Sequence, residues 1–416
     1  MRSKAPEPIL TLGIIGDLHM GTPGDEVAVR QSLAALREHG VAAVVVCGDI
    51  VGDGVTGTDR FRPFARAWNA VFPAGCGVER LVVLGERDVV GKGVAEAWRT
   101  AFGEEYASRE VKEVDGFRFV LCREPEGPVG ELSGGGRRIF VVRHFPLTEA
   151  DGKLPPDAIA VTGHTCAPLT DPRTIRPNCG CVTADASSLL HLRAPGGREN
   201  ALAGGLPPEA AEWRHMPDIS REAGKACHGM VARANSCGVT FSRLDLATGR
   251  ALDEDVFVPH GAEGVSALEC RAAACPAPEF PEDAEVFVEE GTGKTMAGKI
   301  ERQLTVRFPT ARAPSRAFDY SVTVRYSETD LVKTAVEKRV YAYGLFSPED
   351  EAMASCVFGF DELPWDVELD FEIVPRTAFG GAGRPLCAKG YIESPEARAK
   401  RLKKERKAAM EKAVRT

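Results

Sequence analysis

The sequence has no Cys-x-x-Cys pair, no excess of positive charge, and no run of eighteen or more apolar residues. Without such a run, no segment is expected to span a membrane. The net charge of -8, from 52 Lys and Arg against 60 Asp and Glu, argues against general nucleic-acid binding, which needs a basic face. The 12 cysteines are scattered through 416 residues, so we expect mostly buried, reduced thiols and no disulfide framework.

The first residues could be mistaken for a secretory leader. Arg2 and Lys4 precede the apolar run of residues 9–15, but that run is short and leads directly into Asp17-Leu-His19. We therefore interpret it as a first buried strand. The sequence accordingly predicts a cytoplasmic protein, or a secreted one if a leader has been removed.

Residues 9 to about 170 alternate between strand-like and helix-like patterns, which is typical of an α/β fold. Val41–Cys47 is a near-continuous apolar run, as expected of a strand covered on both faces. The glycine-rich stretch Gly130–Gly136 is interpreted as a hairpin turn. The other expected strands are Leu10–Ile15, Leu81–Leu84, Phe117–Cys122, Arg138–Val142 and Ala158–Thr162, and the expected helices are Asp25–Glu38, Thr58–Phe72 and Val94–Phe102.

The pattern turns to β from Cys181 to Pro259, with Ala194–Lys225 expected as a long surface loop. Ala272–Pro281 is rich in Ala and Pro and predicts a domain boundary. Beyond it, a β-sandwich is predicted from seven strand-like runs: Ala284–Glu289, Gln303–Phe308, Tyr320–Arg325, Arg339–Tyr343, Ser355–Phe360, Glu368–Pro375 and Leu386–Ile392. Phe371–Pro375 followed by Phe379–Pro385 is similar to the late strand and loop of fibronectin type III domains.

A terminal helix is predicted to follow Ser394-Pro395-Glu396, an N-cap signature. Residues 395–416 carry nine Lys or Arg against three Glu. A protein partner could bind this basic helix or the β-sandwich, and the alternative is a solvated helix packed through Leu402 and Met410. The expected domains are residues 1–262, 272–393 and 394–416.

Five short polar clusters each follow a strand-like run. They are Asp17-Leu-His19, Gly48-Asp49, Gly85-Glu86-Arg87-Asp88, His144-Phe-Pro146 and Gly163-His164-Thr-Cys166. Open α/β sheets bind ligands beyond the carboxyl ends of their strands, so we expect these side chains to converge. Oxygen, imidazole and thiolate donors converging there can hold divalent cations. Two such ions, about 3.5–4 Å apart, can activate water and grip a phosphate.

In this order the clusters resemble the motifs of the calcineurin-like metallophosphoesterases, over roughly residues 9–260. The resemblance implies an α/β/β/α sandwich, here followed by an all-β, fibronectin III-like sandwich. It implies one or two divalent ions, with Zn, Fe or Mn expected, and a small-molecule phosphate mono- or diester attacked by a metal-bound hydroxide. It implies a first metal on Asp17, His19, Asp49 and Cys166, and a second on Asp49, Glu86, His144 and His164.

Three positions depart from the family pattern. Glu86 and Arg87 stand where the family has Asn and His, and Cys166 stands where it has His. Glu86 can ligate a metal as an anion, or it can pair with Arg87. Cys166 either ligates as a thiolate, which favours zinc or iron, or is an inert buried thiol.

Arg87 and Asp88 are the candidate catalytic residues. The resemblance implies that a histidine at position 87 would assist phosphate binding and leaving-group protonation. Arginine can grip a phosphate oxygen but cannot give up a proton near neutral pH, so we expect a bias toward good leaving groups such as aryl phosphates. For Asp88 the alternative role is bracing its loop.

Two other functions compete with the enzyme. A degenerate pseudoenzyme would keep the fold and part of the metal cage while acting as a binding or scaffold protein. Alternatively, the C-terminal sandwich could be an adhesion or glycan-binding module that the N-terminal half anchors.

Overall fold

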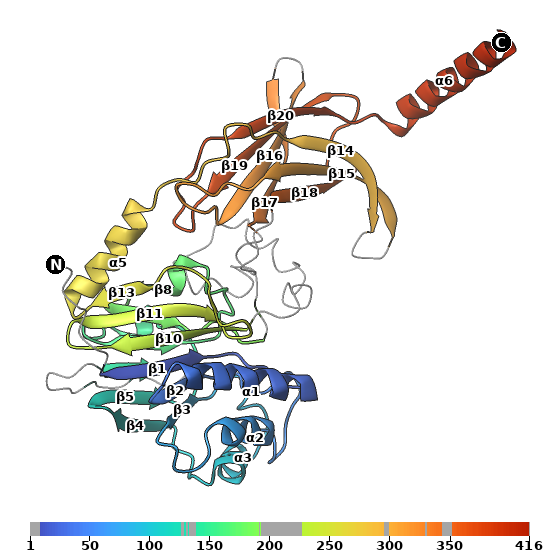
Figure 1. Ribbon diagram of the computed structural model, residues 1–416. Coiled ribbons are helices and arrows are strands. Elements are labelled where there is room, and N and C mark those ends of the chain that lie inside the picture. The colour runs from blue at the N-terminus through green and yellow to red at the C-terminus, as the bar shows by residue number, and fades with distance from the viewer. Residues whose placement is uncertain are drawn as a thin grey trace. The chain divides into compact units, whose positions relative to one another are not determined.

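The computed structural model describes residues 9–125, 129, 132, 139–190, 192, 227–294, 299–328, 331–342 and 352–415. Its chain divides into two compact units, one reaching Ala274 and the other beginning at Cys275 (Figure 1). The expected loop Ala194–Lys225 lies outside the described residues. No helix among the described residues is both long enough and apolar enough to cross a bilayer.

The first sheet of the N-terminal unit has seven strands, in the order β12-β11-β10-β1-β2-β3 with β13 beside β11. β1, β2 and β3 are parallel, so their carboxyl ends lie at one edge. The bounds are β1 Leu10–Ile15, β2 Ala43–Cys47, β3 Glu79–Val83, β10 His228–Ala234, β11 Gly238–Asp245, β12 Arg250–Ala251 and β13 Val256–Pro259.

The second sheet has six strands in the order β4-β5-β6-β7-β9-β8. Its strands are β4 Arg109–Val114, β5 Phe117–Cys122, β6 Ile139–Val142, β7 Ile159–Thr162, β8 Ile175–Asn178 and β9 Cys181–Asp185. β5 and β6 are parallel, so the predicted hairpin at Gly130–Gly136 is wrong, because a tight hairpin joins antiparallel strands. Most of that glycine-rich stretch lies outside the described residues.

The two sheets enclose one apolar core, and helices cover the outer face of the first sheet. All five residues of β2 are buried, as the unbroken apolar run predicted. Val45 faces the core between the sheets, while Val44 and Val46 face the helices. The helices are α1 Pro23–Glu38, α2 Arg62–Val71, α3 Val94–Phe102 and α5 Ala262–Ala274, the last packing against β8, β9 and β13.

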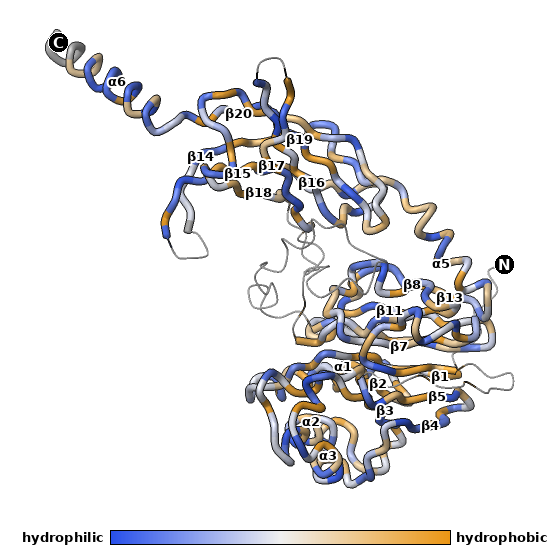
Figure 2. The backbone as a smooth tube through the Cα atoms, turned by 180° about the vertical axis from the view of Figure 1, so that it is seen from behind, coloured by the Kyte–Doolittle hydropathy of each residue, from blue (hydrophilic) through white to orange (hydrophobic). Residues whose placement is uncertain are grey.

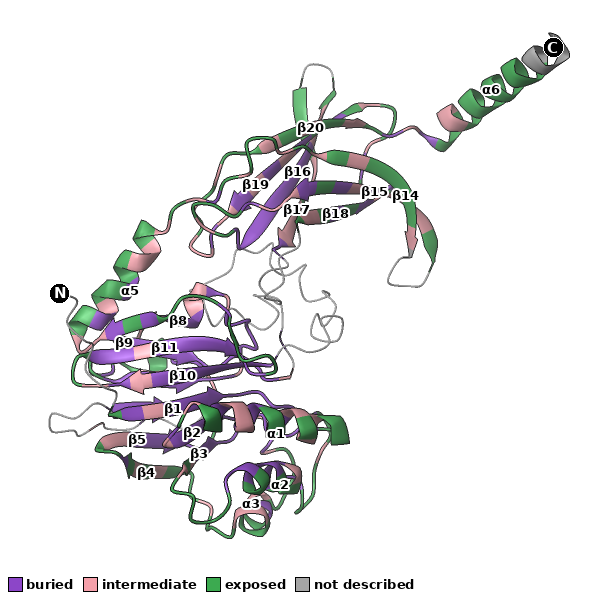
Figure 3. Cartoon of the chain, viewed as in Figure 1, coloured by how far each residue is buried: buried purple, intermediate pink, exposed green. Residues whose placement is uncertain are grey.

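These layers confirm the expected α/β sandwich. The apolar face of α1 presents Leu33 and Leu36, and α2 and α3 add Trp68 and Trp98 to the same cluster. Figure 3 shows the strands of this unit largely buried beneath more exposed helices. Figure 2 shows the matching hydropathy, with the strands rich in hydrophobic residues.

The C-terminal unit is an all-β sandwich of three and four antiparallel strands, in the orders β14-β15-β18 and β17-β16-β19-β20. Each of the seven predicted strands overlaps an observed strand, but β14 begins three residues later than predicted and β17 eight residues earlier. The bounds are β14 Phe287–Lys294, β15 Ile300–Pro309, β16 Asp319–Glu328, β17 Leu331–Tyr341, β18 Met353–Gly359, β19 Glu368–Arg376 and β20 Leu386–Tyr391. The fibronectin III-like assignment stays a prediction. The terminal helix α6 spans Pro395–Arg415, and Ser394 Oγ caps it by accepting the Ala397 N–H at 3.1 Å.

Candidate metal centre

Five parallel strands bring the predicted ligands to one place. β1, β2 and β3 end beside one another in the first sheet (Figure 1), and β6 and β7 do so in the second. The candidate ligands follow these strands directly: Asp17 and His19 after β1, Asp49 after β2, Glu86 after β3, His144 after β6, and His164 and Cys166 after β7. All seven lie in three overlapping sets of donor atoms within 4.8 Å of one another. The convergence expected from the sequence is therefore present.

The backbone at these positions adopts an unusual conformation. Five of the nine non-glycine residues with positive φ in the described chain are candidate ligands: Asp17 (47°), His19 (46°), Asp49 (46°), His164 (71°) and Cys166 (52°). Residues with a Cβ rarely adopt this left-handed backbone conformation, which costs about 1–3 kcal/mol per residue. The surrounding structure must offset that cost. Strain concentrated in this way is typical of functional sites.

Asp17, His19 and Cys166 form a nearly equilateral triangle of donors, which we call the Asp17 group. Cys166 Sγ lies 3.5 Å from Asp17 Oδ1 and 3.9 Å from His19 Nε2, and the nitrogen lies 3.7 Å from the same carboxylate oxygen. All three residues are buried. The group combines a carboxylate, an imidazole and a thiol in a site sheltered from water.

The dimensions of the Asp17 group fit a single metal ion. Tetrahedral zinc with bonds of about 2.0–2.3 Å to oxygen, nitrogen and sulfur separates its ligand atoms by about 3.3–3.6 Å. The observed separations of 3.5, 3.7 and 3.9 Å are close to this range. The soft sulfur donor favours zinc or iron over magnesium or calcium.

Glu86, His144 and His164 form a second triangle, the Glu86 group, with different dimensions. Glu86 Oε2 lies 2.6 Å from His144 Nε2 and 3.4 Å from His164 Nδ1, and the two imidazole nitrogens are 3.3 Å apart. A separation of 2.6 Å is that of a direct, charge-assisted hydrogen bond. Against burial, hydrogen bonds from both histidines lower the pKa of Glu86.

Asp49 lies between the two groups, as expected of a bridging carboxylate. Its Oδ2 is 3.7 Å from His19 Nδ1, and its Oδ1 is 3.7 Å from His144 Nε2. The Asp49 side chain is fully buried, and this burial raises its pKa despite the neighbouring His144. Burial likewise raises the pKa of Asp17 to about 7.

Arg87 binds this central carboxylate at both oxygens. Its backbone N–H donates to Asp49 Oδ1 and its Nε donates to Asp49 Oδ2, each at 3.1 Å. The guanidinium also pairs with Asp53. The Arg87 guanidinium, considered from the sequence as a partner of Glu86, is held by Asp49 and Asp53.

His144 has a fixed orientation. Its Nδ1 lies 2.7 Å from the backbone carbonyl oxygen of Cys47, which can accept a hydrogen bond but cannot donate one. Nδ1 therefore carries a proton, and Nε2 faces the other candidate metal ligands. This arrangement is common for metal-binding histidines. Burial alone would lower the pKa of His144, but Glu86, with Asp17 and Asp49, raises it to about 9.

Asp88 braces the loop that follows β3. Its fully buried carboxylate accepts backbone N–H groups from Gly85 at 2.9 Å, Val51 at 3.0 Å and Ile50 at 3.1 Å. Burial and the charge of Asp49 raise its pKa to about 7, against these hydrogen bonds. Of the two roles expected for Asp88, the contacts support loop bracing.

Two glycines make room for the donors. A Cβ on Gly85 would lie 2.1 Å from Asp49 Oδ1, and a Cβ on Gly48 would lie 2.6 Å from His144 Nδ1. Gly48 also has a φ of 80°, which permits the turn after β2. Both positions therefore require the absence of a side chain.

Sequence reasoning missed two residues that support the centre. Arg60 is buried, and its Nη1 donates to the carbonyl oxygens of Asp88 at 3.0 Å and Val90 at 2.8 Å. Asp53 holds the far side of the Arg87 guanidinium. A single arginine or aspartate in a polar stretch carries no distinguishing pattern, so neither residue could be identified from the sequence.

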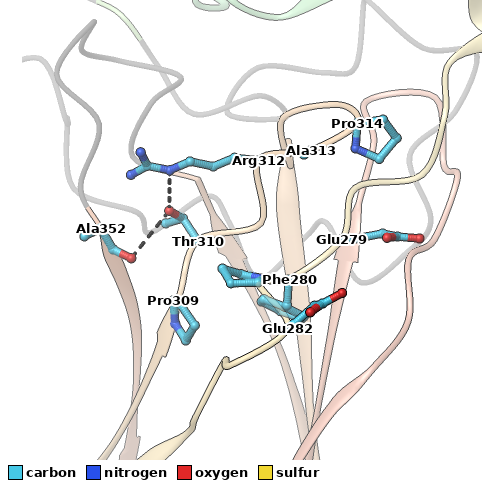
Figure 4. A pocket seen from close by; sticks show the side chains of 10 residues that line it. Glu279, Phe280, Glu282, Pro309, Thr310, Arg312, Ala313, Pro314 and Ala352 are labelled. Atoms are coloured by element: carbon cyan, nitrogen blue, oxygen red, sulfur yellow. Dashed lines mark hydrogen bonds between the residues drawn. The ribbon is translucent and has the colours of Figure 1, made fainter.

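A separate groove of about 800 Å³ lies in the C-terminal unit and shares no residue with the metal centre. Figure 4 shows Arg312 Nε donating to Thr310 Oγ1 at 2.9 Å, and the hydroxyl donating to the Ala352 carbonyl at 3.5 Å. Phe280 and Pro309 are among its apolar lining residues. No chemistry is assigned to it.

No protein-family model matches the chain, and no curated protein matches it. A dimetal phosphatase from Danio rerio is similar in structure, with 13% identity, 61% of this chain and 100% of that chain covered, and a TM-score of 0.33. GAP50, the anchor in the inner membrane complex of Plasmodium, has 13% identity, coverages of 66% and 98%, and a TM-score of 0.36. Purple acid phosphatase PPD1 from yellow lupin, Lupinus luteus, has 12% identity, coverages of 67% and 58%, and a TM-score of 0.37. At these values the chemistry must be argued from the geometry of the centre.

Proposed function

We propose that this protein is a metal-dependent phosphoesterase that hydrolyses a phosphate mono- or diester. One observation carries the proposal. The Asp17 group has separations of 3.5–3.9 Å between three different donor types, in a buried site at converging strand ends. Converging donors of this kind bind divalent cations, and such a cation can promote the hydrolysis of a phosphate ester.

Each residue then has a defined task. Asp17, His19 and Cys166 would hold the ion, with Asp49 beside them. When bound, a divalent ion supplies Lewis acidity toward a phosphoryl oxygen and lowers the pKa of a coordinated water. The Arg87 guanidinium, 14% exposed at its side chain, would bind a second phosphoryl oxygen through its N–H donors.

The residues at positions 87 and 88 also limit which substrates the proposed enzyme can hydrolyse. Arg87 cannot protonate a leaving group near neutral pH. Asp88 commits its oxygens to three backbone N–H groups. We therefore expect efficient hydrolysis of aryl phosphates, whose leaving groups need little protonation, and slow hydrolysis of alkyl esters.

A matched pair of cysteine variants tests the proposal. Cys166→Ser removes the thiolate from the Asp17 group, whereas Cys181→Ser changes an equally buried thiol in a separate apolar cluster. Turnover of an aryl phosphodiester is measured after loading with Zn, Fe, Mn or Mg. We expect turnover in the wild type and in Cys181→Ser, and a loss in Cys166→Ser. Equal activity in all three proteins would exclude Cys166 as a ligand.

The rival function is a binding or scaffold protein without turnover. The observation that favours it is the 2.6 Å contact of Glu86 with His144, together with the hold of Arg87 on Asp49. These contacts satisfy charges that a two-metal enzyme would leave for its ions. Metal binding without hydrolysis of any mono- or diester would favour this rival.

A further inference from the structure

We propose that Arg87 takes the place of a second metal ion, so that the chain binds one divalent ion, in the Asp17 group. The inference rests on the proposed metal centre and concerns its stoichiometry. It predicts that the Glu86 group stays closed around its own hydrogen bond while the Asp17 group accepts the ion.

The first argument is the difference in size between the two triangles. The Asp17 group has edges of 3.5, 3.7 and 3.9 Å, and an ion between its donors would replace only the weak hydrogen bond from the Cys166 thiol to Asp17 Oδ1. The Glu86 group has an edge of 2.6 Å, which an ion could occupy only by breaking the hydrogen bond between Glu86 and His144.

The second argument is the charge already placed at the bridging position. A second ion would need Asp49, but both of its oxygens accept hydrogen bonds from Arg87 at 3.1 Å. An incoming cation at this carboxylate would meet the permanent positive charge of the guanidinium. The like charges repel strongly in a buried setting, where screening by water is weak.

The third argument is that Arg87 is anchored through both its backbone and its side chain. The backbone N–H and Nε of Arg87 both bind Asp49, and the exposed Asp53 pairs with its guanidinium. The next residue, Asp88, is pinned by backbone N–H groups, and Arg60 binds the Asp88 carbonyl oxygen. The guanidinium is therefore a built part of the centre.

The consequence for the proposed reaction is a mixed centre of one ion and one guanidinium. The ion would polarise one phosphoryl oxygen, and Arg87 would neutralise charge on another. Such a centre binds a phosphate with the same total number of cationic partners as a two-ion site, but with one partner that cannot be lost to chelators.

Metal counting tests this stoichiometry without reference to activity. Metal-free protein is dialysed against excess zinc, and bound metal is measured by inductively coupled plasma mass spectrometry. We expect one ion per chain for the wild type and for Arg87→Lys, which keeps the charge. We expect two for Arg87→Gln, because without the guanidinium charge a second ion can bind Asp49 and displace the hydrogen bond between Glu86 and His144. Arg66→Gln is the matched control, because Arg66 also pairs with a carboxylate, that of Glu26, and neither residue is a candidate ligand.

Substitution of zinc by cobalt shows whether the counted ion binds at Cys166 in the Asp17 group. A thiolate-to-cobalt charge-transfer absorption should rise to completion with the first equivalent of Co²⁺ in the wild type and be absent in Cys166→Ser. Two zinc ions per wild-type chain, or one ion in a folded Arg87→Gln, would overturn the inference and leave the proposed function standing. If Arg87→Gln does not fold, the wild-type count remains decisive. No bound ion would overturn both.

Discussion

The Nδ1 atom of His144, after β6, lies 2.7 Å from the carbonyl oxygen of Cys47, the last residue of β2. This hydrogen bond ties the second sheet to the first at the edge where the candidate ligands converge. It also directs His144 Nε2 toward Glu86. One backbone carbonyl thereby links the two sheets and orients the imidazole of the Glu86 group.

Replacing this histidine should separate stability from metal binding. His144→Ala leaves the buried Cys47 carbonyl without its donor, and we expect the free energy of unfolding to fall by about 1–3 kcal/mol. Zinc binding should remain at one ion per chain, since the Asp17 group is intact. Urea denaturation and metal counting measure the two effects. Loss of the ion together with stability would show that the groups do not bind independently.

Gly85 should tolerate no side chain. In Gly85→Ala the new Cβ would lie 2.1 Å from Asp49 Oδ1 and 2.5 Å from the Asp49 backbone nitrogen. We expect a loss of about 1–3 kcal/mol in unfolding free energy and weaker zinc binding, because the bridging carboxylate must move. Gly21→Ala is the control, since a Cβ there would meet no atom within 4 Å. Equal stability of the two variants would contradict the geometry described for this turn.

His228 should lower the free energy of unfolding as the pH falls. The side chain is fully buried, and its Nδ1 accepts the Leu169 N–H at 3.0 Å. Burial lowers the pKa of His228 to about 4, against about 6.5 in the unfolded chain. The unfolded state therefore takes up the proton first as pH falls. The stabilisation is complete above about pH 6.5 and is lost progressively toward pH 4, by about 3 kcal/mol in all.

The comparison for this effect is His228→Gln, because other buried groups titrate in the same range. The raised pKa values of Asp17 and Asp88, each about 7, act in the opposite direction in both proteins. We expect the stability advantage of the wild type over the variant to shrink between pH 7 and pH 4, in urea denaturation with chelator present. An advantage that does not change with pH would exclude His228 as the source.

Leaving-group dependence should reveal the role of Arg87 in the proposed reaction. For a series of phosphate esters, we expect the rate to fall steeply as the leaving-group pKa rises, because Arg87 cannot supply a proton. In Arg87→His the slope should be shallower, with a gain of about 10²–10⁴ for the poorest leaving groups. Equal slopes would show that residue 87 does not limit leaving-group protonation.

Much of the architecture follows from local patterns in the sequence. The buried run of β2 and the seven strands of the C-terminal unit were predictable because side-chain alternation and turn residues encode them directly. The convergence of the ligands was predictable because parallel strands end together. The parallel pairing of β5 with β6 was not, since the sequence between them resembles a turn.

The finer structure of the centre depends on contacts across the fold. Arg87 binds Asp49, 38 positions away, and nothing in the local pattern distinguishes this from pairing with its neighbour Glu86. Arginine is usually a surface residue, but Arg60 is buried and donates hydrogen bonds to backbone carbonyl groups. α5 was not predicted, because its apolar side, with Leu268, is narrow.

A crystal structure of the zinc-loaded protein, with anomalous data collected at the zinc edge, decides whether these donors form a metal site. We expect one strong anomalous peak in bonding contact with Asp17, His19 and Cys166, and Arg87 still bound to Asp49. Absence of a peak there, with the three side chains surrounded by solvent alone, would contradict the metal centre and the hydrolase built on it.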